Sequence, residues 1–306
     1  MKKITIGQTG LETPQLAVGC MRLGALEEKK AQAFVDSALE LGANFFDHAD
    51  IYGGGVCESV FAKAIQMSPS VREKVIIQSK CGIVPGRMFD FSKKHILESV
   101  DGILSRLDTE YLDILLLHRP DALMEPEEVA DAFRVLKSSG KVRHFGVSNQ
   151  DPMTIELLSK YVDEPLACNQ LQLSITNSTM LSQPMNINML DNPAIDRDNG
   201  IRVYCRLKGI TIQAWSPLQH GMFEGPFIGS PKFSALNKKL EEVAAKHEAS
   251  PTAIAFAWIA RLPEKVQPVT GTTNPERLKE CIKGMGIELS REDWYGLYLA
   301  AGHRLP

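Results

Sequence analysis

The sequence has no long uninterrupted apolar segment. No run of about 18 apolar residues, the length that suggests a membrane-spanning helix, occurs among its 306 residues. The amino-terminal residues MKKITIGQTGLETPQL contain two lysines near the start but no apolar stretch after them, so they do not form a secretory signal. We therefore expect a cytoplasmic protein with no membrane partner.

Closely spaced metal ligands are also missing. The six cysteines lie far apart without a C-x-x-C pair, and the seven histidines supply no close pairs either. Zinc sites usually need such pairs, whereas isolated thiols are typical of a reducing compartment. We therefore expect no metal site. The cysteines are Cys20, Cys57, Cys81, Cys168, Cys205 and Cys281.

Charge of one sign is not in excess. Lysine and arginine number 34 against 37 aspartate and glutamate residues, and no long run of like charge occurs, which predicts no nucleic-acid partner. A hydrophobic content of 44% and a charged content of 23% are typical of a soluble globular protein with one large core. Length alone does not distinguish one large barrel from two ordinary domains.

Repetition along the chain favours the barrel. Short apolar segments predict eight strands at Leu16–Gly19, Asn44–Asp47, Val75–Lys80, Leu112–His118, His144–Val147, Ala167–Leu171, Thr211–Trp215 and Val266–Thr270. Helical periodicity predicts helices at Glu28–Glu40, Glu58–Gln66, Lys93–Arg106, Pro126–Ser138, Pro152–Lys160, Ile195–Lys208, Ala235–Glu248 and Pro251–Arg261. Apolar strands alternating with helices indicate a covered parallel sheet, and eight such units predict a single (β/α)8 TIM barrel domain over residues 1–306.

Further segments lie outside this repeat. Residues 3–16 predict a hairpin that turns at Gly7–Gly10 and closes the floor of the barrel. Two additional helices are expected after the last strand, at Pro275–Lys283 and Arg291–Ala301. Two connections, Gly82–Ser92 and Thr176–Pro193, are longer than usual, so they either build a substrate pocket or lie on the surface as irregular loops.

Polar residues end three successive strands. The segments FFDHADIY, KVIIQSK and YLDILLLH place Asp47, Tyr52, Lys80 and His118 at or just past these ends. The carboxyl ends of barrel strands form the catalytic face, because the strands converge there. A single polar strand end usually marks only the point where the strand meets solvent. Four residues with complementary chemistry are less readily explained in that way, so they indicate an enzyme.

These four residues match what the reduction of a carbonyl group requires. The carbonyl oxygen needs a proton donor and a neighbourhood that stabilises developing negative charge. Tyr52 is the candidate donor, and a nearby Lys80 ammonium is expected to lower the pKa of its phenol. Asp47 would hold Lys80 charged and oriented, and His118 would add a second hydrogen bond to the carbonyl oxygen. In the alternative, Tyr52 covers apolar surface, Lys80 faces solvent and His118 is an ordinary edge histidine.

Later strand ends carry groups suited to a planar, amide-bearing ligand. Ser148, Asn149 and Gln170 offer hydroxyl and amide groups for a carboxamide, and Trp215 offers a flat face for stacking. Together they predict a site for a nicotinamide ring.

A possible phosphate site follows the last strand. Gly271, Thr272 and Thr273 precede a helix whose amino terminus is a natural anion site, with Arg277 one turn further on. The same residues also make a good helix cap without any ligand.

Taken in order, these segments resemble the aldo-keto reductases. The resemblance extends from about residue 5 to 285 and includes FFDHADIYGGG, QSKCG, LLLHRPD, GKVRHFGVSN, the NQ pair, AWSPL and PVTGTTNPER. The segments HADIYGG and LLLHRPD resemble the bacterial YdhF-type oxidoreductases in particular. The resemblance implies a barrel that binds NADPH without a Rossmann domain and reduces aldehydes or ketones.

The resemblance also assigns residues. Tyr52 matches the general acid, and Asp47, Lys80 and His118 complete the catalytic group. Other positions match family residues that contact the ribose, the carboxamide, the stacked ring, the pyrophosphate, the 2′-phosphate and the adenine of the cofactor. They are Gly19, Cys20, Met21, Ser148, Asn149, Gln170, Trp215, Ser216, Leu218, Gly221, Gly271, Thr272, Thr273, Arg277, Glu280 and Cys281. Cys281 stands where the family often has an amide, and Gly271 where many members have a lysine. NADPH is still expected over NADH.

Two other functions fit parts of the pattern. Family members attached to potassium channels suggest a cofactor-binding regulatory subunit, although no long amino-terminal extension for docking is present. A metal-dependent hydrolase is disfavoured because Lys80 lies between the available ligands His118 and Asp47.

The sequence does not specify the substrate. Residues that could border its pocket are Arg22, Phe89, Phe91 and Arg119, and Arg22 either attracts an anion or forms an internal salt bridge.

Overall fold

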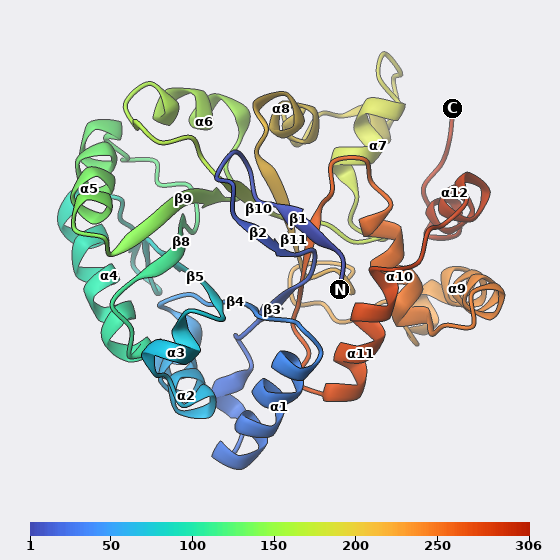
Figure 1. Ribbon diagram of the computed structural model, residues 1–306. Coiled ribbons are helices and arrows are strands. Elements are labelled where there is room, and N and C mark those ends of the chain that lie inside the picture. The colour runs from blue at the N-terminus through green and yellow to red at the C-terminus, as the bar shows by residue number, and fades with distance from the viewer.

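The chain forms a closed barrel of eight parallel strands, in a computed structural model that describes residues 1–306 (Figure 1). Around the barrel the strands are β3 (Ala17–Gly19), β4 (Phe45–Asp47), β5 (Ile76–Cys81), β8 (Leu112–Leu117), β9 (Val142–Ser148), β10 (Cys168–Gln172), β11 (Thr211–Trp215) and β12 (Gln267–Thr270), which pairs again with β3. Each predicted strand overlaps one of these. The predicted α/β barrel is therefore confirmed.

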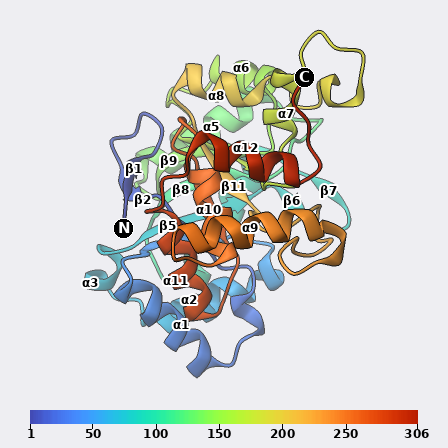
Figure 2. The same cartoon turned by 90° about the vertical axis from the view of Figure 1, so that its right-hand side faces the viewer.

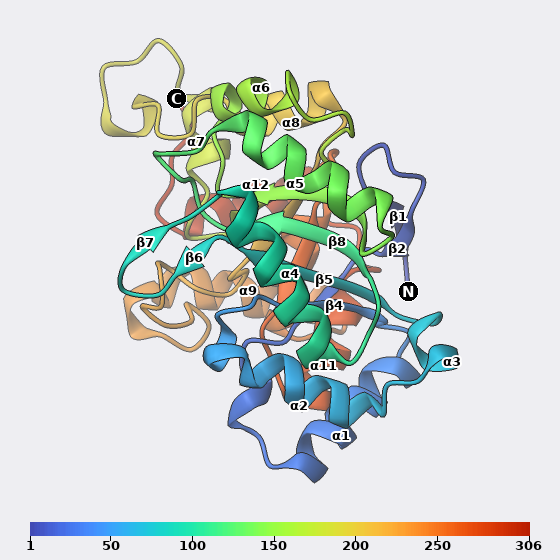
Figure 3. The same cartoon turned by 90° about the vertical axis from the view of Figure 1, so that its left-hand side faces the viewer.

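Helices surround the barrel, as the two side views show (Figures 2 and 3). They are α1 (Glu28–Glu40), α2 (Val56–Ile65), α3 (Pro69–Arg72), α4 (Lys93–Leu107), α5 (Pro126–Ser138), α6 (Pro152–Ser159), α7 (Thr179–Met185), α8 (Ile201–Lys208), α9 (Ser234–Lys246), α10 (Pro251–Ala260), α11 (Pro275–Gly284) and α12 (Arg291–Ala300). The main apolar core lies between these helices and the outward-facing side chains of the strands.

Helix starts follow the capping residues of the sequence. The Asp151 carboxylate accepts hydrogen bonds from the N–H groups of Met153 and Thr154 at the start of α6, and Ser250 accepts one from Ala253 at the start of α10. In both helices a proline follows the cap at the first helical position, where no N–H is needed. Both helices begin at the predicted residues, Pro152 and Pro251.

The helix predicted at Ile195–Lys208 is too long at its amino end. It begins only at Ile201, because Asp196 accepts hydrogen bonds from the main-chain N–H groups two and three residues further on and forms a turn instead. Asn199 and Gly200 have φ angles of 49° and 67°, which are incompatible with a continuing right-handed helix.

The two long connections both contain regular structure. Residues 82–92 form a small hairpin of β6 (Ile83–Val84) and β7 (Met88–Phe89), and the second connection contains α7. The alternative in which both connections are irregular loops is therefore wrong, and of the two only the first contributes to the cavity described below, through Ile83.

Helix α3 was not predicted. It begins where the Ser68 hydroxyl accepts a hydrogen bond from the N–H of Val71.

The amino-terminal hairpin closes one end of the barrel. It consists of β1 (Lys3–Thr5) and β2 (Glu12–Pro14), as predicted. Ile4 and Ile6 pack with inward-facing apolar side chains such as Phe45 and Ile114 in a small core that is separate from the outer one. The β6–β7 hairpin projects from the opposite end (Figure 3). That end carries the carboxyl termini of the strands.

The barrel interior is layered, because alternate residues of each strand point inward. In β5 the inward positions are Ile76, Gln78 and Lys80, from the closed end to the open one. Ile76 belongs to the apolar core that the hairpin covers, and Gln78 and Lys80 are both completely buried. An apolar layer is thus followed by an amide layer and then by a charged one.

The amide layer is a connected set of glutamines. Gln213 donates to the carbonyl oxygens of Gln78 at 3.0 Å and Gln267 at 2.8 Å, and it accepts from Gln78 at 2.9 Å and Gln170 at 3.1 Å. Gln267 in turn donates to the main-chain oxygen of Pro14 at 2.7 Å. Hydrogen bonds therefore connect the floor hairpin to the centre of the barrel.

Replacing Gln213 by leucine should destabilise the fold. The substitution leaves side-chain oxygens of Gln78 and Gln267 without their strongest donor in a dry interior, at a cost of about 1–3 kcal/mol for each unsatisfied group. We expect the free energy of unfolding, measured by chemical denaturation, to fall by about 2–4 kcal/mol. The control Gln32→Leu, on a partly exposed position of α1, should change it by less than about 0.5 kcal/mol. Equal effects of the two substitutions would contradict a stabilising amide layer.

Candidate active site

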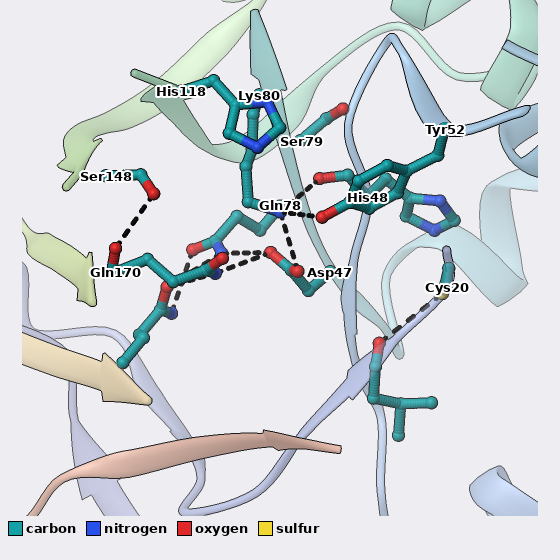
Figure 4. Close-up of polar contacts among 12 residues, drawn as sticks. Cys20, Asp47, His48, Tyr52, Gln78, Ser79, Lys80, His118, Ser148 and Gln170 are labelled. Atoms are coloured by element: carbon teal, nitrogen blue, oxygen red, sulfur yellow. Dashed lines mark hydrogen bonds and ion pairs between the residues drawn. The ribbon is translucent and has the colours of Figure 1, made fainter. Parts of the chain in front are cut away.

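The strand ends bring Asp47, Lys80 and Tyr52 together at the open end of the barrel (Figure 4). The Lys80 ammonium donates hydrogen bonds to Asp47 Oδ2 at 2.8 Å, to the main-chain oxygen of His48 at 2.8 Å and to the Tyr52 hydroxyl oxygen at 3.1 Å. All three N–H donors of this fully buried side chain are used. Because Lys80 donates to the phenol, the Tyr52 hydroxyl keeps its own hydrogen for another acceptor.

A glycine turn places Tyr52 over this ion pair. Tyr52 begins a 3-10 turn that ends at Gly55, and the three glycines have φ angles of 58°, 62° and 93°. A side chain on Gly55 would also meet Arg106, whose Cδ lies 2.7 Å from the position of an added Cβ. The sequence YGGG therefore allows the chain to reverse directly after the phenol.

Hydrogen bonds hold the other oxygen of Asp47. Its Oδ1 accepts from the side-chain amides of Gln78 at 2.6 Å and Gln170 at 3.0 Å. Both glutamines are also bonded to Gln213, so the amide layer fixes the carboxylate that holds Lys80. This support was not predicted, because Gln78 and Gln213 lie inside the apolar runs of their strands.

Burial and charge set the protonation states. Burial alone would lower the pKa of Lys80, but the negative charge of Asp47 and the hydrogen bonds to Asp47 and Tyr52 raise it above its usual value, so the ammonium persists. Burial raises the pKa of Tyr52, and the Lys80 charge offsets only part of that effect. Lys80 thus lowers the Tyr52 pKa as predicted, but the expected net lowering is wrong because burial outweighs this effect. The phenol holds its proton at neutral pH, as a proton donor must.

His118 follows the end of β8 and faces Tyr52. The two ring centroids are 6.2 Å apart with the rings nearly perpendicular. Burial and the positive charges of Lys80 and Arg119 hold the pKa of His118 well below its usual value, so the imidazole is neutral. Its Nδ1 atom is buried without a hydrogen-bond partner, unlike that of an ordinary satisfied edge histidine.

The four residues predicted for a carboxamide and its ring are bonded to one another. The Trp215 indole donates to Asn149 Oδ1 at 3.1 Å, and the Asn149 amide donates to Ser148 Oγ at 2.7 Å and to the main-chain oxygen of His118 at 3.3 Å. Ser148 donates to the main-chain oxygen of Gln170 at 2.9 Å. The side chains are therefore held in place, and Gln170 Oε1 remains as an acceptor.

A cavity of about 900 Å³ opens above this group. Most of the predicted site residues line it, namely Gly19, Met21, Asp47, Tyr52, His118, Ser148, Asn149, Gln170, Trp215, Ser216, Leu218, Gly271, Thr272, Thr273, Arg277 and Cys281. Residues from both ends of the sequence thus reach one cavity.

Three predicted cofactor residues do not line the cavity: Cys20, Gly221 and Glu280. Cys20 is completely buried, and its thiol lies toward the main-chain oxygen of Val18 (Figure 4). Its main-chain N–H donates to the main-chain oxygen of Asp47. Lys80 also lies behind the surface of the cavity. The side chains of Phe89 and Phe91, considered for the substrate pocket, do not border the cavity either.

The turn after β12 is capped by its own residues. Asn274 Oδ1 accepts a hydrogen bond from the N–H of Arg277 at 3.1 Å, and the Thr272 hydroxyl accepts one from the N–H of Asn274 at 3.1 Å. Arg22 donates to the main-chain oxygen of Gly271 at 2.7 Å and has no acidic partner, so it does not form the salt bridge considered for it. Arg22 and Arg277 line the same side of the cavity, beside the neighbouring strands β3 and β12.

Some lining residues were not recognised in the sequence: Ile51, Ile83, Gln219, Met222, Phe223, Pro226, Ile228, Thr252 and Asn274. Several belong to the long loop after β11, of which only the segment AWSPL and Gly221 were recognised. Gln219 carries a buried side-chain oxygen without a partner. No periodicity marks this loop, so only the unusual Gly and Pro content of LQHGMFEGP could have indicated it.

Two structural findings concern other classes of protein. No cluster of three or more His, Cys, Asp or Glu side chains that could hold a metal ion is present. No helix combines the length and the apolar character that are needed to cross a bilayer.

A family model described as the aldo/keto reductase family matches residues 15–297. The chain belongs to this family. Among its relatives, the uncharacterized oxidoreductase YcsN of Bacillus subtilis is 35% identical and the oxidoreductase YdhF of Escherichia coli is 34% identical, each over the full length of both chains.

A solved structure supports the same assignment. The thermostable aldo-keto reductase Tm1743, in complex with the inhibitor epalrestat, is 29% identical and superimposes with a TM-score of 0.78 over 98% of this chain and all of that one. The predicted resemblance, including the YdhF-type oxidoreductases, is therefore confirmed. Aldo-keto reductases are oxidoreductases that reduce carbonyl groups with nicotinamide cofactors.

Asp50 lies just behind the site and is poorly satisfied. Its Oδ1 atom is buried without a partner, and its N–H donates to the main-chain oxygen of Lys80 at 3.0 Å. Burial and the nearby negative charge of Glu58 raise the pKa of Asp50 to about 7. In the unfolded chain the same group ionises near its usual pKa of about 4.

Replacing Asp50 by asparagine should therefore stabilise the protein at high pH only. Between about pH 4 and 7 the folded state keeps a proton that the unfolded state loses, so stability falls as pH rises through this window. We expect Asp50→Asn to raise the free energy of unfolding by roughly 1–3 kcal/mol at about pH 8, and by much less near pH 4. Denaturation curves at several pH values, with the exposed Asp36→Asn as control, measure this. A difference from wild type that does not vary with pH would contradict the assignment.

Proposed function

We propose that the protein is an NADPH-dependent reductase of aldehydes or ketones, with Tyr52 as the general acid. The observation that carries this proposal is the buried contact between the Lys80 ammonium and the Tyr52 hydroxyl, at 3.1 Å, beside a cavity of about 900 Å³. The phenol is protonated, its hydrogen is not donated within the protein, and a cation is in place to stabilise the phenolate that remains after proton transfer.

Each of these residues has a separate role in the proposed reduction. A bound nicotinamide cofactor supplies the hydride that forms the new C–H bond at the carbonyl carbon. The carbonyl oxygen takes the proton from the Tyr52 hydroxyl, and the resulting phenolate is stabilised by Lys80 until it is reprotonated from solvent. Neutral His118 donates a hydrogen bond that positions the carbonyl oxygen, and Asp47 keeps Lys80 charged and in place.

The cavity residues fit the proposed cofactor. Trp215 presents a planar ring, and Gln170 keeps an acceptor for the carboxamide N–H groups. On the side of β12, Thr272 and Thr273 offer hydroxyl groups beside two guanidinium groups, those of Arg277 and Arg22. A cavity with cations at one side and an aromatic ring in its wall suits a ligand that carries phosphates and a flat ring.

The choice of NADPH over NADH rests on the two arginines near β12. An additional phosphate on the ribose would use charge that NADH does not need. The family contains both preferences, since one relative, 26% identical, is named NADH-specific methylglyoxal reductase of Escherichia coli. Another, 31% identical, is named 6-dehydroglucose reductase of Agrobacterium fabrum, so small aldehydes and sugar carbonyls are both reasonable substrates to try.

We also place the protein in the cytoplasm. All six cysteines are buried and unpaired, which is compatible with a thiol-reducing compartment. Separation of cell fractions, followed by immunodetection, would test this placement, and a secreted or envelope-bound pool would contradict it.

Tyr52→Phe tests the assigned acid. Wild-type protein should oxidise NADPH in the presence of a panel of reactive aldehydes, seen as a loss of near-ultraviolet absorbance. The substitution removes one oxygen and should lower kcat by at least about 100-fold, the lower range expected for positioned acid catalysis. Tyr161→Phe, at an exposed tyrosine, is the matched control and should retain full activity. Full turnover by Tyr52→Phe would contradict the assignment.

The same protein can be tested for a regulatory role. A cofactor-binding sensor subunit would bind NADPH tightly and oxidise it once, without steady-state cycling. Rapid mixing of the NADPH-bound protein with an aldehyde distinguishes the two functions: repeated turnovers support the reductase, and a single turnover supports the sensor.

Arg277→Met tests the cofactor preference without any chemistry. Loss of one charged hydrogen-bonding group should weaken the binding of NADP⁺ by roughly 10-fold to 100-fold, and that of NAD⁺ much less. Isothermal titration calorimetry measures both dissociation constants. The control Arg291→Met removes the same charge from the start of α12. Equal losses for NADP⁺ and NAD⁺ would show that Arg277 does not contact the additional phosphate.

A further inference from the structure

Arg119 is a cation without a counter-ion inside the reaction cavity. It follows His118 directly, it is half-buried, and it lines the cavity. Its guanidinium makes no hydrogen bond and no ion pair within the protein. The nearest aromatic group is Trp215, whose ring centroid lies 5.6 Å from the guanidinium carbon. Its N–H donors are therefore available to a ligand in the cavity.

The one buried arginine of this fold has a full set of partners, in contrast to Arg119. Arg72, which is buried near the amino end of the barrel, donates to Thr109, to the main-chain oxygens of Val75 and Tyr111, and to Asp113. Taking a guanidinium partly out of water is unfavourable unless its donors are satisfied. Burial accordingly lowers the pKa of Arg119 from its usual value. A purely structural arginine would be expected to have partners like those of Arg72.

The cavity itself supplies no acid for Arg119. The only carboxylate that lines it is Asp47, and both oxygens of Asp47 are already bonded to Lys80 and two glutamines. An anion that satisfies Arg119 must therefore enter with a ligand.

The proposed cofactor phosphates lie on the other side of the cavity. In the closed barrel, β8 is four strands away from β12 in either direction, so the ends of these two strands face each other across the opening. Arg277 and Arg22 lie beside β12 and β3, whereas Arg119 follows β8 and comes directly after His118, which faces Tyr52. Arg119 is thus placed beside the reacting carbonyl group.

We propose that Arg119 binds an anionic group on the substrate, so that the preferred substrates are aldehydes or ketones that also carry a carboxylate or a phosphate. This inference rests on the proposed reductase function. A guanidinium donates two parallel hydrogen bonds to either anion. His118 and Tyr52 then hold the carbonyl end while Arg119 holds the anionic end.

Matched pairs of substrates test the proposal. The first pair is 4-oxobutanoate and its neutral amide 4-oxobutanamide, and the second is glyceraldehyde 3-phosphate and glyceraldehyde. Wild-type protein should favour the anion of at least one pair by about 10-fold or more in kcat/KM, and the favoured pair identifies carboxylate or phosphate as the anion. Arg119→Met should reduce that preference by roughly 10-fold to 100-fold, mainly through KM. Arg119→Lys should retain part of it, and the control Arg291→Met all of it.

Two results would overturn the proposal. One is a wild-type preference for the neutral member of both pairs. The other is an Arg119→Met variant that lowers kcat/KM equally for anion and neutral twin while its circular dichroism remains native.

A binding measurement keeps the proposal testable without turnover. Succinate and inorganic phosphate are titrated by calorimetry into wild type, Arg119→Met and Arg291→Met, each in the presence of saturating NADP⁺ so that the proposed phosphate site beside Arg277 is occupied. At least one anion should bind, with affinity lost in Arg119→Met and retained in Arg291→Met. Equal binding of both anions by wild type and Arg119→Met would contradict an anion site at Arg119. If no carbonyl compound oxidises NADPH but Arg119 still binds an anion, the reductase function fails and the site remains.

Discussion

The ion pair between Lys80 and Asp47 is the interaction on which the site depends. A buried ammonium costs several kcal/mol unless it is paired and its donors are satisfied. Here Asp47, the main-chain oxygen of His48 and the Tyr52 hydroxyl satisfy all three donors of a lysine that is completely buried. The same bond that stabilises the charge also orients the phenol, so stability and proton donation share one contact.

The glutamine layer beneath explains how a barrel can hold such a pair. A carboxylate in an apolar interior needs hydrogen bonds as well as a counter-ion. Gln78 and Gln170 supply them to Asp47, and Gln213 and Gln267 continue the network to Pro14 in the floor hairpin. The floor is thereby linked to the catalytic end of the barrel. Arg119 lies outside this network, and its guanidinium faces the cavity without a counter-ion in the protein.

Much of the fold and of the site is predictable from local sequence, because strands, caps and polar strand ends leave local patterns. Asp47, Lys80 and His118 were found in that way. The glutamine layer was not, since the inward direction of Gln213 depends on how the strands close into a barrel. The Tyr52 pKa could not be predicted either, because the effect of burial competes with that of Lys80. The loop containing Gln219 has no periodic pattern, so its place over the cavity is set by tertiary contacts alone.

The titration of Tyr52 tests most directly whether this phenol is a protonated acid that Lys80 controls. Tyrosine labelled with ¹³C at the ring carbon bearing the hydroxyl gives one resonance for each of the six tyrosines, and the Tyr52→Phe spectrum assigns the one of interest. We expect the Tyr52 phenol to be protonated at neutral pH, with a pKa above the usual value that rises further in Lys80→Met. A phenolate at neutral pH, or a Tyr52 titration that does not change when Lys80 is removed, would contradict this expectation.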